Sequence, residues 1–109
     1  MTDLAISTQP DSDRTVRLIA TGEIDMASAE QVTAAAGKAL TTHTPAHLII
    51  DLTAVTFLDS TGIAALLAAR HLAEEQSCTL RVTGIHGIVE RVLDVTGLLG
   101  VLDGPPPHC

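Results

Sequence analysis

Aromatic side chains are almost absent from this sequence of 109 residues, which has no Trp, no Tyr and one Phe, Phe57. Basic residues are also scarce, with Lys+Arg 6 against Asp+Glu 13 and a formal net charge of −7. Nucleic-acid binding needs positive charge against phosphates and benefits from rings on which bases stack. The composition therefore argues against a nucleic-acid-binding protein.

Long hydrophobic runs and paired cysteines are lacking as well. The uncharged stretch Ser60–Ala69 is far shorter than the ~20 residues of a membrane-spanning helix. The first fourteen residues have no basic lead followed by an apolar run. Cys78 and Cys109 have no metal-binding or redox spacing, and we expect neither to form a disulfide. With 46% hydrophobic residues the chain can bury a core. We expect a cytoplasmic protein of one domain over 1–109, with an ordered core of about 4–103 and a Pro-rich tail at 104–109.

The first third of the sequence predicts a hairpin followed by a helix. Apolar alternation over 4–8 and 16–20 indicates two strands joined by a turn at Pro10, the second ended by Gly22. A helix is expected from Met26 to Leu40, capped by Asp25 or Ser28.

The remaining sequence alternates strands with helices. Its predicted elements are a buried strand at 48–52, a turn at 53–54, an extended piece at 55–58, a helix from Asp59–Gly62 to Gln76, a strand at 80–83, a helix at 88–93 and a closing apolar element at 98–102. Such alternation favours parallel pairing. The predicted fold class is therefore α/β: a small mixed sheet, mostly parallel, with an N-terminal antiparallel edge and about four helices.

The segment Asp59-Ser60-Thr61-Gly62 holds two hydroxyls beside a carboxylate where a strand gives way to a helix. Ser60 is the expected N-cap, and the free amides and dipole of a helix start favour an anion, including a phosphate on Ser60 itself. The next residues, Gly62–Ala69, have no polar side chain. Either this helix is covered on all sides or its outer face is a docking surface of small residues.

Three segments resemble the STAS-domain anti-sigma factor antagonists of bacteria: Gly22–Asp25, Asp59–Gly62 and Arg91–Leu98. The resemblance covers roughly Leu4 to Asp103 and implies a STAS fold and a protein that is not itself an enzyme. It implies that an anti-sigma factor with serine-kinase activity phosphorylates Ser60, with Thr61 as a minor acceptor, and that a serine phosphatase reverses the step. The unphosphorylated form would bind the anti-sigma factor and free the sigma factor. The expected partner-binding residues are Asp25, Asp59, Ser60, Thr61, Gly62, Ile63, Ala64, Leu66 and Leu67.

Other functions receive less support from the residues. A stand-alone STAS subunit docking on the ATPase of a membrane transport complex is the main alternative. A serine hydrolase would need a base such as His71 or His86 beside Ser60, and no nucleophile-elbow motif surrounds that serine. His43 and His47 have the spacing of helical metal ligands, but Pro45 between them disfavours the helix. We expect no metal, no cofactor and no membrane insertion.

Overall fold

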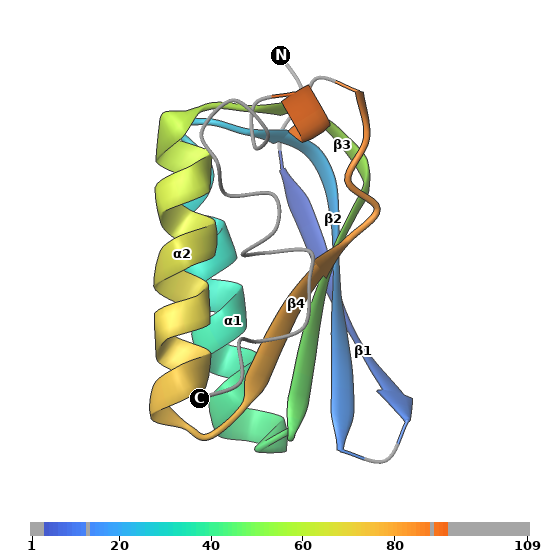
Figure 1. The fold of residues 1–109 in the computed structure, drawn as a ribbon, viewed down its shortest axis with the longest axis vertical. Coiled ribbons are helices and arrows are strands. Elements are labelled where there is room, and N and C mark those ends of the chain that lie inside the picture. Colours follow the sequence, from blue (N-terminus) through green and yellow to red (C-terminus); the bar gives the residue numbers. More distant parts are fainter. Residues whose placement is uncertain (1–3, 13, 88, 92–109) are drawn as a thin grey trace.

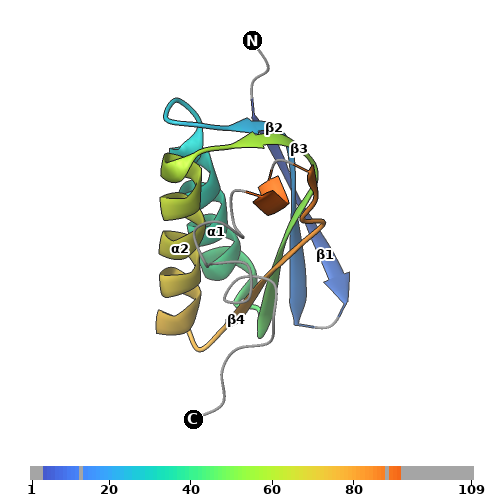
Figure 2. The ribbon, with the colours of Figure 1, turned by 45° about the horizontal axis from the view of Figure 1, so that its top comes forward.

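The protein is a two-layer α/β domain, seen here in a computed structural model that describes residues 4–12, 14–87 and 89–91. A four-stranded sheet has the order β1-β2-β3-β4, in which β1 and β2 are antiparallel and the other neighbours are parallel. Both long helices cover the same face of this sheet (Figures 1 and 2). The predicted mixed sheet with an antiparallel N-terminal edge is confirmed. The elements are β1 (Ala5–Ser12), β2 (Thr15–Ile24), α1 (Ala29–His43), β3 (His47–Leu58), α2 (Ser60–Glu75) and β4 (Thr79–Thr83).

The hydrophobic core lies between the sheet and the two helices. Alternate residues of β2 and β4 are buried, and the start of β3 follows the same alternation. Cys78, which precedes β4, also belongs to this core, and burial raises the pKa of its thiol. The largest fully buried side chains are Leu18, Ile24, Leu48, Ile50, Leu52, Leu58, Leu66, Val32, Val55 and Val82.

The N-terminal hairpin turns later than predicted. Pro10 lies inside β1, paired with Val16, and the turn includes Arg14, which has a positive φ of 64°. Proline is tolerated there because β1 is an edge strand with a register shift between Pro10 and Ser12. Gly22 does not end β2 either: with a φ of 118° it lies at a second register shift, and the strand continues to Ile24.

The predicted turn at Thr53–Ala54 is wrong, because β3 runs without interruption through it. The side chains of Asp51 and Thr53, which would favour a turn, are hydrogen-bonded to each other within the strand. The Asp51 carboxylate accepts hydrogen bonds from the Thr53 backbone N–H at 2.9 Å and from its hydroxyl at 2.6 Å. The pairing with β2 shifts register at this point, so the local turn chemistry produces an irregularity rather than a break.

The C-terminal predictions lie mostly outside the described residues. Helical backbone is present at 89–91, at the place where the third predicted helix begins. The rest of that helix, the closing element at 98–102 and the tail at 104–109 belong to the part of the chain that the structure does not describe.

Asp51 gives the fold a testable pH dependence. Burial raises the pKa of its carboxyl, but the Thr53 hydrogen bonds and the nearby Arg17 guanidinium outweigh burial and hold the pKa below its usual 3.8. A lowered pKa stabilises the fold above the unfolded value, and this contribution disappears as the pH falls through the folded value. We expect Asp51→Asn to lower the free energy of unfolding by about 1 kcal/mol at pH 7.

Urea unfolding of both proteins at several pH values tests this expectation. The gap between wild type and Asp51→Asn should shrink as the pH falls below 3.8. Asp11→Asn is the matched control, because Asp11 also pairs with Arg17, at 3.3 Å, but is more exposed. Its effect should stay below about 0.5 kcal/mol. A gap for Asp51→Asn that persists unchanged at pH 2 would contradict the assignment.

Candidate functional site

The residue that caps the start of α2 is Asp59. The sequence had predicted Ser60 as the N-cap, and this prediction is wrong. Asp59 has an extended backbone, and its Oδ1 accepts a hydrogen bond from the Gly62 N–H at 3.0 Å. The Asp59 carbonyl also accepts the helical hydrogen bond from the Ile63 N–H. A carboxylate suits this position because it satisfies a free amide and carries the charge that the helix dipole favours. Ser60 becomes the first residue of the helix. Its side chain is exposed, and its hydroxyl makes no hydrogen bond to any described residue.

Gly62 brings the start of α2 directly onto the sheet. A Cβ at this residue would lie 2.4 Å from Leu58 Cδ1, 2.8 Å from Ile24 Cγ2 and 3.0 Å from the Ile24 carbonyl oxygen. Both neighbouring side chains are fully buried, so neither has room to move aside. The glycine is therefore required by close packing, and this packing fixes the position of Ser60 relative to the ends of β2 and β3.

The turn between β2 and α1 is held by Asp25 and Ser28. Asp25 Oδ1 accepts hydrogen bonds from the N–H groups of Ala27 at 3.0 Å and Ser28 at 3.2 Å. The buried Ser28 hydroxyl donates to the Glu23 carbonyl at 2.8 Å and accepts from the Asp25 N–H at 3.0 Å. Because these bonds fold 25–28 into a turn, α1 begins at Ala29 and not at Met26. Ser28 is its N-cap residue but makes no side-chain capping bond, so the predicted capping geometry is not formed.

The two turns meet at one end of the domain. The Asp59 N–H donates to the Ile24 carbonyl at 3.3 Å, and Glu23 and Ile24 pair with Phe57 and Leu58. Asp25 and Asp59 are 34 positions apart in the sequence. The segments that hold them are nevertheless neighbours at the carboxyl ends of the parallel strands. Open α/β sheets commonly place their ligand sites at this end.

The predicted partner-binding residues divide between the surface and the core. Ser60 and Ala64 are exposed, and Asp25, Asp59, Thr61 and Leu67 are partly exposed. Gly62, Ile63 and Leu66 are buried against the sheet and hold the helix in place.

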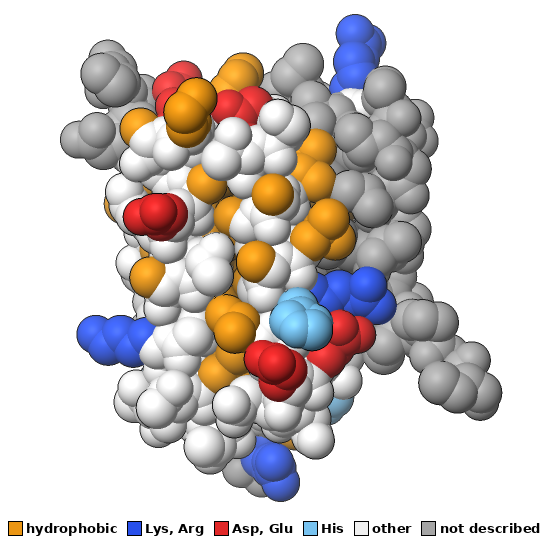
Figure 3. Space-filling view, turned by 90° about the vertical axis from the view of Figure 1, so that its left-hand side faces the viewer, with side chains coloured by type: hydrophobic (Ala, Val, Ile, Leu, Met, Phe, Trp, Pro, Cys, Tyr) orange, Lys and Arg blue, Asp and Glu red, His pale blue; other side chains and the backbone are white. Residues whose placement is uncertain are grey.

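The outer face of α2 is apolar as well as accessible. Beyond Ala64 and Leu67, Ala68 is also exposed, and the first charged or titratable side chains of the helix are Arg70 and His71. Figure 3 shows hydrophobic side chains along this face, with acidic side chains at its top edge. The described residues therefore do not cover this helix on all sides, and a docking surface on its outer face stays a prediction. Among the described residues, no helix is long and apolar enough to span a membrane.

Two exposed hydrophobic side chains at this end were not among the predicted site residues. Met26 is 79% exposed and Phe57 is 40% exposed. Met26 was missed because it was assigned to the first turn of α1, and Phe57 because it was assigned to a short extended piece. The Asp25-Met26-Ala27-Ser28 spacing, in which an Asp and a Ser can bond each other's backbone, was the available signal for a turn.

Among the described residues, neither His71 nor His86 is hydrogen-bonded to Ser60. His71 lies eleven residues further along α2, about 16 Å away at the helical rise, and contacts Glu75. The Nε2 atom of His86 lies 2.7 Å from the Thr53 carbonyl oxygen. The described part of the chain has no group of three or more His, Cys, Asp or Glu side chains that could hold a metal ion. α1 ends at His43, so His43 and His47 do not share a helix.

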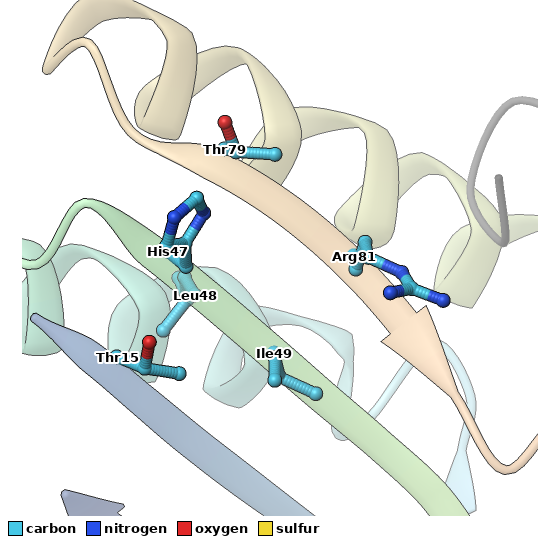
Figure 4. A pocket seen from close by; sticks show the side chains of 6 residues that line it. All are labelled: Thr15, His47, Leu48, Ile49, Thr79 and Arg81. Atoms are coloured by element: carbon cyan, nitrogen blue, oxygen red, sulfur yellow. The ribbon is translucent and has the colours of Figure 1, made fainter. Parts of the chain in front are cut away.

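A small hollow opens at the other end of the sheet, where β2, β3 and β4 begin (Figure 4). Its volume is about 160 Å³, well below the ~300–1,000 Å³ of typical ligand sites. The candidate site is therefore the Ser60 end. The hollow is lined by Thr15, His47, Leu48, Ile49, Thr79 and Arg81.

The family model of the STAS domain matches residues 8–106. The chain therefore belongs to the STAS-domain family, in agreement with the resemblance of its three sequence segments. It is similar to an anti-sigma F factor antagonist of Paenibacillus polymyxa, with 25% identity over 81 residues that make up 74% of this chain and 69% of the relative.

Solved structures agree with this assignment. An anti-sigma factor antagonist from Mycobacterium paratuberculosis shares 27% identity with a TM-score of 0.80, over 97% of this chain and 87% of that one. A sulfate transporter family protein from Wolinella succinogenes has a TM-score of 0.72 at 18% identity, over 86% of this chain and 75% of that one. The second likeness shows the fold alone.

Proposed function

We propose that this chain is an anti-sigma factor antagonist controlled by phosphorylation of Ser60. In its unphosphorylated form it binds an anti-sigma factor in the cytoplasm and frees the sigma factor. The anti-sigma factor acts as a serine kinase on Ser60, and a serine phosphatase restores the binding form. The chain itself catalyses no step of this cycle.

The observation that carries the proposal is the state of the Ser60 side chain. It is exposed at the first position of α2, and the capping hydrogen bond that would occupy it is made by Asp59 instead. A kinase can therefore reach the hydroxyl without opening the fold. Thr61 is partly buried and is the less accessible of the two hydroxyls.

The surroundings of Ser60 explain how a phosphate acts on binding. It adds about −1.5 to −2 charges at neutral pH next to Asp59 and at the same end of the domain as Asp25. The helix N-terminus offsets about 0.3–1 kcal/mol of the repulsion in an exposed setting, so the domain itself stays folded. A partner packed over the apolar face of α2 has to desolvate the phosphate or place it against its own surface. The switch is then exclusion at the interface and not refolding.

The test is phosphorylation by an anti-sigma factor with ATP, followed by mass spectrometry. Each anti-sigma factor of kinase type from the source organism is incubated with the wild type, Ser60→Ala and Thr61→Val. We expect one phosphate on Ser60 in the wild type and in Thr61→Val, and none in Ser60→Ala. Phosphate on another residue, or no phosphate with any of these kinases, would overturn the proposal.

The transport alternative shares the fold but not the use of Ser60. The likeness to the sulfate transporter family protein supports it through the fold alone. Stable co-purification of the chain with a membrane transport complex, unaffected by Ser60→Asp, would favour it over the switch.

A further inference from the structure

Met26 and Phe57 are the large hydrophobic side chains that are exposed in the described part of the chain. Single exposed hydrophobic residues are common on protein surfaces and need no explanation. These two, however, lie on the two segments that border Ser60, one from the turn after β2 and the other from the end of β3. Their position at one end of the domain is therefore the feature to explain.

Met26 is presented by an ordered turn. The Asp25 carboxylate accepts hydrogen bonds from the N–H groups of Ala27 and Ser28, the two residues that follow Met26. The buried Ser28 hydroxyl donates to the Glu23 carbonyl at 2.8 Å. Since the side chain is 79% exposed, it contributes little to the core. Its apolar surface is exposed to water and would contribute favourable free energy only if a partner buried it.

Phe57 lies close to Ser60 by chain geometry alone. Phe57 is three positions before Ser60, so the two Cα atoms are at most about 11 Å apart. Phe57 pairs with Glu23, and the Leu58 side chain next to it is buried in the core. Neighbouring side chains of a strand point to opposite faces, so Phe57 lies on the side of the sheet away from the helices. A partner that covers both Met26 and Phe57 has to reach over the end of the sheet.

The same two segments are acidic. Residues 22–28 and 56–62 contain Glu23, Asp25 and Asp59 and no Lys or Arg. A partner surface complementary to this end carries basic side chains around apolar pockets.

We propose that Met26 and Phe57 are the apolar anchors by which this chain holds its anti-sigma factor, whose surface carries two apolar pockets with a basic rim. The inference rests on the proposed function and adds to it the residues that supply affinity. It also gives a role to Phe57, the one Phe in a sequence without Trp or Tyr. Large side chains in desolvated pockets dominate binding energies at interfaces.

The experiment compares polar and apolar replacements at each anchor. The affinity for the anti-sigma factor that phosphorylates Ser60 is measured by calorimetry, with a nucleotide analogue that cannot transfer phosphate. We expect Met26→Ser and Phe57→Ser each to weaken binding about tenfold or more. The matched controls Met26→Leu and Phe57→Leu keep an apolar side chain and should change the affinity less than about threefold. Thermal unfolding of all four variants checks that they are folded.

The possible results separate this inference from the proposed function. If the wild type binds and is phosphorylated but both serine variants bind equally well, the anchors are refuted and the switch stands. If the wild type neither binds nor receives a phosphate, both fail. Analytical ultracentrifugation tests whether the chain associates with a second copy of itself. If the wild type self-associates and the serine variants do not, while their affinity for the anti-sigma factor is unchanged, the two side chains contact a second copy and the inference is overturned.

Discussion

Gly62→Ala is expected to lower the free energy of unfolding by about 2 kcal/mol, within the range measured for overpacked cores. The added methyl group would lie 2.4 Å from Leu58 Cδ1 and 3.0 Å from the Ile24 carbonyl oxygen. The side chains of Leu58 and Ile24 are 1% and 0% exposed, so the start of α2 has to move away from the sheet. In a domain of this size the loss corresponds to a decrease of about 10 °C in the melting temperature. Calorimetry or urea unfolding measures it directly.

Gly37→Ala is the matched control, because Gly37 also lies in a helix but has no atom within 4 Å of the position of an added Cβ. Alanine favours helix over glycine by about 0.8–1 kcal/mol. The two Gly→Ala changes should therefore have opposite signs. A Gly62→Ala protein as stable as the wild type would refute the close packing that positions Ser60.

Ser60→Asp should weaken binding to the anti-sigma factor about a hundredfold, whereas Ser60→Ala should bind like the wild type. Aspartate places a charge beside Asp59 at a surface that the partner has to desolvate, and a few kcal/mol there amounts to about this factor. Alanine removes the acceptor hydroxyl without adding charge. Because Ser60 is exposed and does not cap the helix, neither variant should lose more than about 0.5 kcal/mol of stability.

Ser7→Asp controls for the extra charge itself. Ser7 is an exposed serine on β1, which is separated from β3 by β2. A general effect of making an acidic protein more acidic would weaken binding equally in Ser7→Asp and Ser60→Asp. Binding should fall only for the change at Ser60. Equal affinity of Ser60→Ala and Ser60→Asp would show that electrostatic exclusion is wrong.

The sequence predicted the architecture because its signals were local and periodic. The alternation of strands with helices led to parallel pairing. The run at 48–52 led to a buried strand; the strand is present, but its side chains alternate between buried and partly exposed, because both long helices lie on one face of the sheet (Figure 1). The resemblance of Asp59–Gly62 to a known motif placed the site at a helix start. The parallel pairing and the helix that begins at Ser60 are confirmed, and the site at this helix start stays a prediction.

The errors arose where the local signal allowed two outcomes. Asp59 and Ser60 are both good N-cap residues. In the structure Asp59 is the cap, and the Gly62 N–H that it accepts from belongs to the residue packed against Ile24 and Leu58. A proline such as Pro10 normally indicates a turn. Here it lies in an edge strand, where a residue without a backbone N–H is tolerated because one side of the strand has no partner strand. These outcomes depend on tertiary contacts that the sequence does not display.

The most direct test of the account compares the anti-sigma factor's affinity for two forms of the wild type, unphosphorylated and fully phosphorylated on Ser60. Calorimetry measures the affinity, and circular dichroism compares the two folds. The account predicts a loss of at least about a hundredfold in affinity on phosphorylation, with no change in the spectrum. Equal affinity of the two forms, or a loss of affinity that comes with unfolding, would contradict it.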